Sequence, residues 1–251
     1  MTSTNCDRSG ASVSVGAFTL VELLVVLTIM AILVFLAVPA ISGLKKSGDL
    51  TSAAYEISGA ISQSRTYAIA NNTYVWLGFF EENGSESSTQ PATAGTGRVV
   101  ICSVASADGT LPYTATAPAA IPGANLILAS KLLKIDNLHL VTFPVTVGGV
   151  AIPSPGATAN LSIGSTTPAA PSLTSFTYPL TGTTQYTFTK ALQFSPQGEA
   201  RVDNSSATYP LVPVIELGLQ STHGSTIDAT SVNLVSIQVT GVGGDVVVYR
   251  R

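Results

Sequence analysis

Hydrophobic side chains dominate one stretch near the start of the chain. Between residues 18 and 44 the only charged side chain is that of Glu22, and residues 23–38 are apolar except for Thr28. A helix over residues 18–38 would be roughly 31 Å long, which matches the hydrocarbon core of a bilayer. The pattern therefore predicts a transmembrane helix.

Two other kinds of segment compete with this interpretation. A secretory signal peptide ends at small residues, and Ala37 and Ala40 could form such a site, but its apolar part is shorter than this one. An ordinary single-pass anchor is the second alternative. Neither explains Glu22, because an ionisable side chain inside an apolar membrane segment is unfavourable and by default has a functional partner.

A new N-terminus close to Glu22 would explain this carboxylate. If the chain is cut just before Phe18, the freed α-amine lies about one helical turn away, and the positive end of the helix dipole also favours a carboxylate there. In a packed bundle the amine of a neighbouring subunit could take the same place. Either pairing would offset the desolvation of a charge in an apolar environment.

The helix is expected to continue beyond Pro39, which lacks an amide hydrogen and should kink or loosen it. Apolar residues then recur at helical spacing, at Leu50, Ala54, Ile57, Ile61 and Ala68. Asn71 and Asn72 end the pattern. We expect this amphipathic half to dock on a β-sheet.

Beyond Thr73 the hydrophobic period changes from that of a helix to that of a strand. Alternation predicts strands over residues 74–80, 98–104, 139–147, 185–194, 212–219, 232–239 and 245–249. The polar stretches between them are expected to be surface loops. Two hairpins are indicated, one at Pro196 and Gly198 and one at the glycines between Val239 and Val246.

Composition agrees with one compact domain and a helical arm. The 251 residues carry 11 basic and 14 acidic side chains, a net charge of −3, so no basic excess indicates a nucleic-acid footprint. Only 10% of residues are charged, and the second half is rich in small and polar residues. Cys6 falls in the segment expected to be removed, which leaves Cys102 as a small buried residue of a predicted strand.

The residues around the proposed cut resemble a known motif. Residues 17–26, with Ala17, Phe18 and Glu22, resemble the prepilin cleavage and methylation motif of type IV pilins and type II secretion pseudopilins. With Phe18 as the first mature residue, Glu22 is the fifth and Pro39 the twenty-second, as in that family. The family usually has Gly before the cut. Cleavage after Gly16 therefore remains an alternative, although it would make Glu22 the sixth residue.

A second resemblance concerns the domain that follows. Residues 57–77 are similar to the passage from helix to first strand in H-type minor pseudopilins and related minor pilins. Residues 194–198 and the glycine-rich terminal hairpin resemble other turns of that family. The loops of this chain are longer than the usual pattern, so a cassette-encoded group of prepilin-like proteins is an alternative.

Motifs for catalysis or metal binding are not apparent in the sequence. It contains no G-x-S-x-G, H-E-x-x-H, C-x-x-C or Walker motif, and His139 and His223 are far apart. His139 is interpreted as a solvent-facing strand residue. Glu81, Glu82 and Glu86 could offer oxygen ligands to calcium, but a solvated acidic loop is the simpler interpretation. We expect no enzymatic activity, no cofactor and no metal site.

Nucleic-acid binding is the main alternative function. The chain ends in Arg250 and Arg251, and some related minor pilins bind DNA through a basic C-terminal region during uptake. Two exposed arginines could contact phosphates. A solvated terminus explains the same residues without any ligand.

Together these observations predict an α+β fold with three parts. Residues 1–17 form a prepilin leader, residues 18–72 a long N-terminal hydrophobic helix whose part 18–38 spans a membrane or forms a filament core, and residues 73–251 a mostly antiparallel, extracytoplasmic β-sheet domain on which the helix packs. The resemblance implies a minor pilin or pseudopilin. A prepilin peptidase would cut between Ala17 and Phe18 and methylate the new amine.

The resemblance also implies where the protein works and with what. Its expected localisation is the inner membrane, in a single pass, and then a pilus or pseudopilus. Glu22 and Pro39 are the expected assembly residues, and other pilin subunits are the expected partners. An anchored, exported protein without a filament role is the remaining alternative.

Overall fold

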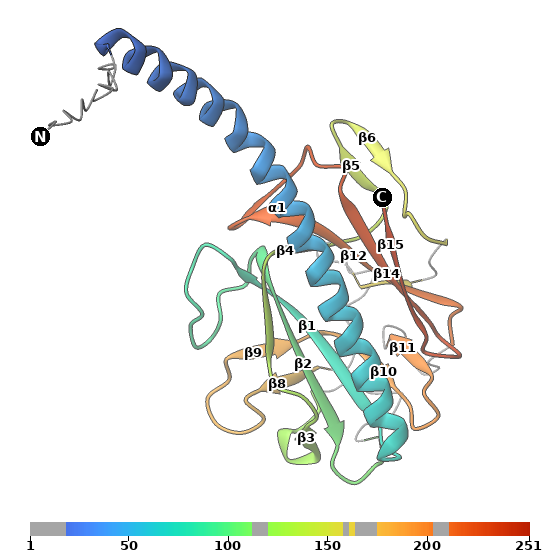
Figure 1. Ribbon diagram of the computed structural model, residues 1–251. Coiled ribbons are helices and arrows are strands. Elements are labelled where there is room, and N and C mark those ends of the chain that lie inside the picture. The colour runs from blue at the N-terminus through green and yellow to red at the C-terminus, as the bar shows by residue number, and fades with distance from the viewer. Residues whose placement is uncertain (1–18, 112–119, 158–160, 164–174, 203–210) are drawn as a thin grey trace, which may run out of the picture. The chain divides into compact units, whose positions relative to one another are not determined.

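The computed structural model describes residues 19–111, 120–157, 161–163, 175–202 and 211–251, with only the helical backbone described over 36–48. It divides into two compact units, Met1–Lys45 and Lys46–Arg251. Helix α1 (Leu20–Ala70) contributes to both units. Figure 1 labels its elements.

The larger unit is built around one sheet of eleven strands. Its path is β11 (Ala200–Val202), β10 (Lys190–Phe194), β1 (Val75–Asn83), β2 (Gly97–Ser106), β4 (Leu133–Val141), β12 (Val214–His223), β14 (Leu234–Thr240) and β15 (Val246–Arg250). Off this path, β3 (Leu126–Leu128) pairs with β2, while β7 (Leu161–Ser162) and β13 (Thr226–Ile227) pair with β12. All pairings are antiparallel except that of β7 with β12.

Shorter elements complete this unit. Two small antiparallel sheets join β5 (Val145–Val147) to β6 (Val150–Ile152) and β8 (Phe176–Tyr178) to β9 (Tyr186–Phe188). A single 3₁₀ turn, η1 (Gly123–Asn125), precedes β3. These pieces lie in stretches where the sequence predicted only loops or parts of longer strands.

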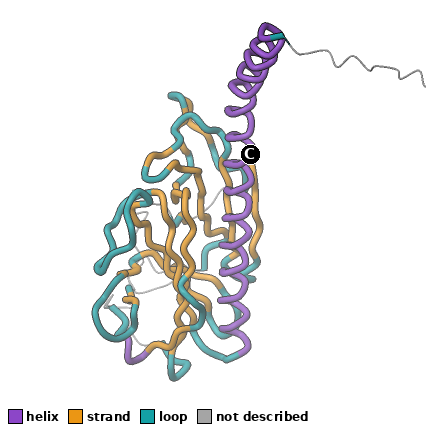
Figure 2. Tube along the Cα trace, turned by 60° about the vertical axis from the view of Figure 1, so that its left-hand side comes forward, coloured by secondary structure: helices purple, strands orange, loops and turns teal. Residues whose placement is uncertain are grey.

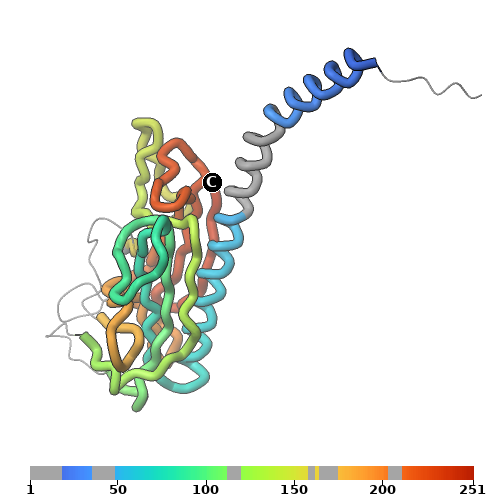
Figure 3. Tube along the Cα trace, turned by 90° about the vertical axis from the view of Figure 1, so that its left-hand side faces the viewer, coloured from blue at the N-terminus to red at the C-terminus, as the bar shows by residue number. Residues whose placement is uncertain are grey.

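Alternating side chains of the central strand β1 enter two different cores. Leu77 and Phe79 belong to the core beneath α1, whereas Trp76 belongs to a second core on the other side. Period-two alternation places successive side chains on opposite faces, so both faces of the sheet are covered. Figures 2 and 3 show the part of α1 after Lys46 along one side of the strands.

The second core lies under the hairpin β8–β9, where Gly78 of β1 leaves room for two rings. A Cβ at this position would lie 2.6 Å from Phe176 and 2.7 Å from Phe188. These rings stack with centroids 4.9 Å apart. Glycine is therefore required here by close packing, although its position in a strand lowers intrinsic strand propensity.

The two ends of the main sheet approach each other beside α1. The amide of Ala200 in β11 donates a hydrogen bond of 2.7 Å to the carbonyl of Gly241, which lies in the turn between β14 and β15. Arg65 of α1 contacts both turns: its Nε lies 3.4 Å from the carbonyl oxygen of Gly198, and its Nη1 lies 3.7 Å from Asp245 Oδ1. The helix is thus attached to both edges of the sheet.

The expected fold class is wrong as stated. The structure is mostly antiparallel β-sheet, and the part of α1 that packs on it is amphipathic, with Leu50, Ile57 and Ile61 buried beneath polar neighbours. The strongly apolar residues of α1 belong to the other unit. The helix that packs on the sheet is therefore not the long hydrophobic helix that was expected.

The predictions of a transmembrane helix and of a single-pass inner-membrane localisation are also wrong. Over the residues that the structure describes, no helix combines the length and the apolar character that crossing a membrane requires.

Several strand boundaries differ from those predicted. The expected strand 139–147 is divided, because Pro144 cannot donate to a ladder, so β4 ends at Val141 and β5 begins at Val145. Strand β4 instead begins at Leu133. Residues 185–194 are likewise divided between β9 and β10.

Both predicted hairpins are confirmed. The first joins β10 to β11, with Gly198 at a φ of 86°, and the second joins β14 to β15, with Gly244 at a φ of 67°. These positive angles suit glycine, which lacks a Cβ. Of the stretches between predicted strands that were expected to be surface loops, residues 112–119, 158–160 and 164–174 lie outside the described residues.

Candidate assembly surface

The most unusual surface of the chain is the apolar stretch 20–35 of α1. Every residue in this stretch is exposed, and its large hydrophobic side chains have between 46% and 79% of their area accessible. They are Leu20, Val21, Leu23, Leu24, Val25, Val26, Leu27, Ile29, Met30, Ile32, Leu33, Val34 and Phe35. Soluble monomers rarely expose continuous apolar surface of this extent. We call residues 20–35 the apolar segment.

Glu22, the one charged residue of the apolar segment, takes part in a capping box. The amide and the hydroxyl of Thr19 each donate to Glu22 Oε2 at 2.9 Å, and the amide of Glu22 donates to Thr19 Oγ1 at 3.3 Å. This reciprocal pattern satisfies two donors that a helix start otherwise leaves unpaired. The backbone hydrogen bond from Thr19, and after it the hydroxyl, lowers the pKa of the Glu22 carboxyl.

The capping box was missed at the sequence level, although its signal was present. Thr19 followed three residues later by Glu22 at the start of an apolar run is the T-x-x-E signature of a helix N-terminus. The box explains Glu22 within one chain. Pairing with an amine remains compatible, because a carboxylate has four acceptor sites and the two bonds from Thr19 use only one oxygen.

The other predicted processing and assembly residues are placed only in part. Ala17 and Phe18, the proposed cleavage pair, lie outside the described residues. Pro39 is included in helix α1, but its side chain is among those the structure leaves undescribed.

The two C-terminal arginines have contacts within the domain. Arg250 donates from Nη1 to Thr51 Oγ1 at 2.5 Å and from Nη2 to Asn233 Oδ1 at 3.3 Å. The amide of Arg251 donates to the carbonyl of Leu234 at 3.1 Å. Arg250 therefore connects the last strand to helix α1, a structural role that its position in the sequence did not reveal.

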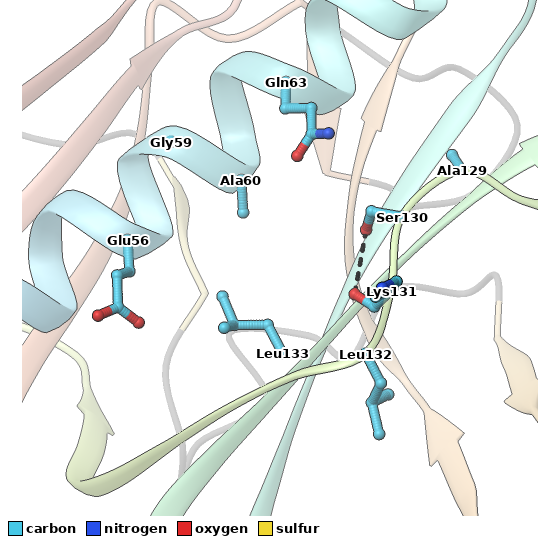
Figure 4. Close-up of a pocket in the computed structure, with 9 residues that line it drawn as sticks. All are labelled: Glu56, Gly59, Ala60, Gln63, Ala129, Ser130, Lys131, Leu132 and Leu133. Atoms are coloured by element: carbon cyan, nitrogen blue, oxygen red, sulfur yellow. Dashed lines mark hydrogen bonds between the residues drawn. The ribbon is translucent and has the colours of Figure 1, made fainter.

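A shallow groove of about 640 Å³ lies beside α1 in the larger unit. One wall comes from the helix residues Glu56, Gly59, Ala60 and Gln63, and the other from residues 129–133 between β3 and β4. Figure 4 shows Gln63 and Leu133 pointing into the space between the two walls, with Glu56 on the helix side. We call this site the helix groove.

Two of the three glutamates considered as calcium ligands, Glu81 and Glu82, are engaged by His139 and by Arg98 respectively. Glu82 is 1% exposed, and its Oε2 lies 3.3 Å from Arg98 Nη1 and accepts a hydrogen bond from Ser88. Arg98 also binds Asp136, whose hydrogen bond is the main reason that the pKa of Arg98 is raised. Within the described part of the chain, no group of three potential ligands could hold a metal ion.

His139 does not face solvent, so its interpretation from the sequence is wrong. It is 5% exposed, and its Nδ1 lies 2.6 Å from Glu81 Oε1. The same oxygen accepts the amide of Leu140 at 3.0 Å. Leu138 and Leu140 enter the core beneath α1, as alternation predicts, but the contact that covers His139 comes from Glu81, 58 residues away along the chain, and could not be seen from the neighbouring sequence.

Cys102 is buried, as predicted from the sequence. Its burial raises the pKa of the thiol to about 12. A thiol that stays protonated is a poor nucleophile.

Comparisons with family models, with curated proteins and with solved structures give no match to this chain.

Proposed function

We propose that this protein is a structural subunit of a pilin-like filament, a minor pilin or pseudopilin, with the apolar segment of each copy buried against those of its neighbours. The observation that supports the proposal is the exposure of every residue from Leu20 to Phe35. Burying an exposed valine, leucine, isoleucine, methionine or phenylalanine side chain contributes about 1.5–3 kcal/mol. The apolar segment exposes thirteen such side chains, so its burial between copies would favour assembly.

The capping box makes this segment suitable for burial. A lone carboxylate would oppose packing, because transfer of an unpaired charge into an apolar environment is very unfavourable. In this chain Glu22 already accepts two hydrogen bonds from Thr19, and its second oxygen can accept a bond from an amine of the adjacent copy.

The resemblance of residues 17–26 to the prepilin motif supplies the maturation step of the proposal. A prepilin peptidase would remove the leader between Ala17 and Phe18 and methylate the new amine of Phe18. Mass spectrometry of protein from the native cell would then find an N-terminus at N-methylated Phe18. An intact Met1 would contradict this step. A terminus at Ala17 would favour the alternative of cleavage after Gly16.

A single charge placed in the apolar segment tests the proposal. Leu27→Lys should reduce incorporation into sheared filaments at least ten-fold, because an unpaired buried ammonium costs several kcal/mol. The matched control is Val150→Lys, at a side chain of the larger unit that is exposed to a similar extent. Both changes lie at exposed sites, so neither should alter folding. Equal incorporation of the two variants would contradict the proposal.

The contacts of the C-terminal residue Arg250 give no support to the DNA-binding alternative. Arg250 is engaged with Thr51 and Asn233, which gives it a role in joining β15 to α1.

A further inference from the structure

The helix groove carries opposite charges on its two walls. Glu56 lies on the α1 wall and Lys131 on the wall that follows β3, and both residues are exposed. Between them the groove is lined by the apolar side chains of Ala60, Ala129 and Leu133. A volume of about 640 Å³ lies within the range of natural binding sites. The groove therefore suits a surface that carries apolar side chains between a cation and an anion.

The two charges of the groove lie at different levels along α1. Ser103 of β2 is level with Ser64 of the helix, because their hydroxyl oxygens are 3.0 Å apart. The carbonyl of Ser103 accepts the amide of Ala129 at 2.9 Å, and Lys131 is only two residues further along the chain. Glu56 precedes Ser64 by eight residues, or about 12 Å along the helix. The carboxylate thus lies nearer the start of α1 than the ammonium does.

The outer face of β15 has an anion and a cation on either side of apolar side chains. Alternate residues of a strand share a face, and the ladder with β14 continues to Arg251, whose amide donates to the carbonyl of Leu234. The Asp245 side chain is 70% exposed, Val247 is 42% exposed, and Arg251 is exposed. We call the face formed by Asp245, Val247, Tyr249 and Arg251 the β15 stripe.

Two contacts give the direction of the β15 stripe relative to α1. Asp245 Oδ1 lies 3.7 Å from Arg65 Nη1, and Arg250 donates to Thr51 Oγ1 at 2.5 Å. The strand therefore runs from the level of Arg65 back toward that of Thr51. In a neighbouring copy with the same orientation, the cation of the stripe lies toward the carboxylate end of the groove. The anion of the stripe lies toward the ammonium end, so both charges match.

The β15 stripe and the helix groove lie on different sides of α1. Thr51 and Arg65 contact β15, whereas Glu56 and Gln63 line the groove. At 100° per residue, these two pairs are separated by roughly 120–180° around the helix axis. Figure 1 shows β15 to the right of α1 and β3, which precedes the other wall of the groove, to its left. One copy can therefore use both surfaces at once.

From these features we propose that the helix groove of one copy binds the β15 stripe of a second copy, with Arg251 facing Glu56 and the carboxylate of the stripe facing Lys131. The inference rests on the proposed filament function and adds a contact between the larger units of neighbouring copies. The apolar side chains of the stripe cover the apolar lining of the groove. Because the two surfaces differ, the contact is head-to-tail and can extend into a helical array.

Cysteine cross-linking between two tagged forms of the full chain tests this contact. Both carry Cys6→Ser, and the buried Cys102 is left in place. One form carries Val247→Cys in the stripe, and the other carries Gln63→Cys, which points into the groove. After co-assembly and mild oxidation, a disulfide-linked heterodimer should form about ten-fold more than with Ser62→Cys, because an interface holds two thiols at high effective concentration. Ser62 is also exposed but does not line the groove.

A charge exchange introduced into both forms tests the pairing of Arg251 with Glu56. Arg251→Glu would place two carboxylates together and should lower the cross-link about five-fold, because like charges across an interface oppose binding. Glu56→Arg should lower it to a similar extent. Both residues are exposed, so neither change should alter folding. The double variant should restore the yield, because it exchanges the two charges and keeps their attraction.

Three results would overturn the inference. The first is an equal yield with Gln63→Cys and Ser62→Cys, and the second is a double variant that cross-links no better than the single ones. The third is slow alkylation of Gln63→Cys in filaments without a cross-link to Val247→Cys, because another surface would then fill the groove.

These outcomes are distinguishable from failure of the filament proposal itself. If Leu27→Lys blocks filament incorporation while the cysteines at Val247 and Gln63 give no excess cross-link, only the groove contact is wrong. If Leu27→Lys has no effect, the filament proposal fails, and this inference fails with it.

Discussion

At the scale of single residues, the buried ion pair between Arg98 and Glu82 should contribute measurably to the free energy of unfolding. Glu82 is almost fully buried, and Arg98 is the cation in contact with its carboxylate. Removing one partner of a buried ion pair leaves an uncompensated charge and costs about 3–5 kcal/mol. Arg98→Met should therefore lower the free energy of unfolding by about that amount.

Urea unfolding followed by circular dichroism measures this change. The matched control is Arg201→Met, which removes the pair with Glu199, both of whose side chains are more than a quarter exposed. An exposed pair contributes about 1 kcal/mol or less. If the two variants lose equal stability, Glu82 does not depend on Arg98.

Glu22 gives a residue-scale prediction with a defined pH dependence. Its pKa is lowered by Thr19, so the cap is formed above the ordinary pKa of a glutamate and is lost as the pH falls through the lower, folded value. The protection of amides at the start of α1, measured as the exchange rate relative to that of an unstructured peptide at the same pH, should therefore fall over that acidic range. Glu22→Ala should show low protection at every pH.

Glu22→Gln separates the cap from the charge. Glutamine can replace glutamate in a capping box, so this variant should keep slow exchange and lose the pH dependence. Exchange as fast as that of Glu22→Ala would show that the Thr19–Glu22 contacts do not protect the helix start.

At the scale of elements, substitutions of two glycines test how the sheet and the helix are packed. Gly78 of β1 is closely packed, whereas Gly59 of α1 faces open space. Gly78→Ala would place a methyl group within 3 Å of Phe176 and Phe188, and overpacking of a core costs about 1–3 kcal/mol. Gly59→Ala adds a methyl group in open space on a helix, which should stabilise by about 0.5–1 kcal/mol. Thermal unfolding of both variants measures these opposite signs; a shift in the same direction would contradict the packing described.

The elements also show how far the sequence could predict this fold. Regular alternation identified the strands that became β1, β2, β12, β14 and β15, and glycine and proline identified both hairpins. Short strands such as β3 and β8 carry too few residues for a period to be visible. The burial of His139 depends on Glu81, which is 58 residues away along the chain.

The candidate site was predictable to a similar degree. The apolar segment and Glu22 were evident from composition, and the T-x-x-E pattern of the cap was present but overlooked. The helix groove was not predictable, because its two walls come from α1 and from residues 129–133, which are brought together only by the tertiary fold. The contact of Arg250 with Thr51 spans 199 residues for the same reason.

At the scale of the whole molecule, the chain combines a larger unit that has its own hydrophobic cores with an apolar segment whose side chains are exposed. The larger unit buries two apolar clusters on opposite faces of its sheet. The apolar segment buries none of its side chains within the described structure. This division of the chain leads to the central claim, that the apolar segment is completed by other copies of the same kind of subunit.

Cross-linking within the apolar segment of assembled filaments tests this claim most directly. Ile29→Cys, in a Cys6→Ser background, should give a ladder of covalent multimers after oxidation of sheared filaments, because the segments of neighbouring copies would lie in contact. The matched control, Val150→Cys, should give monomers. A monomer pattern for Ile29→Cys, or equal ladders from both variants, would contradict the account.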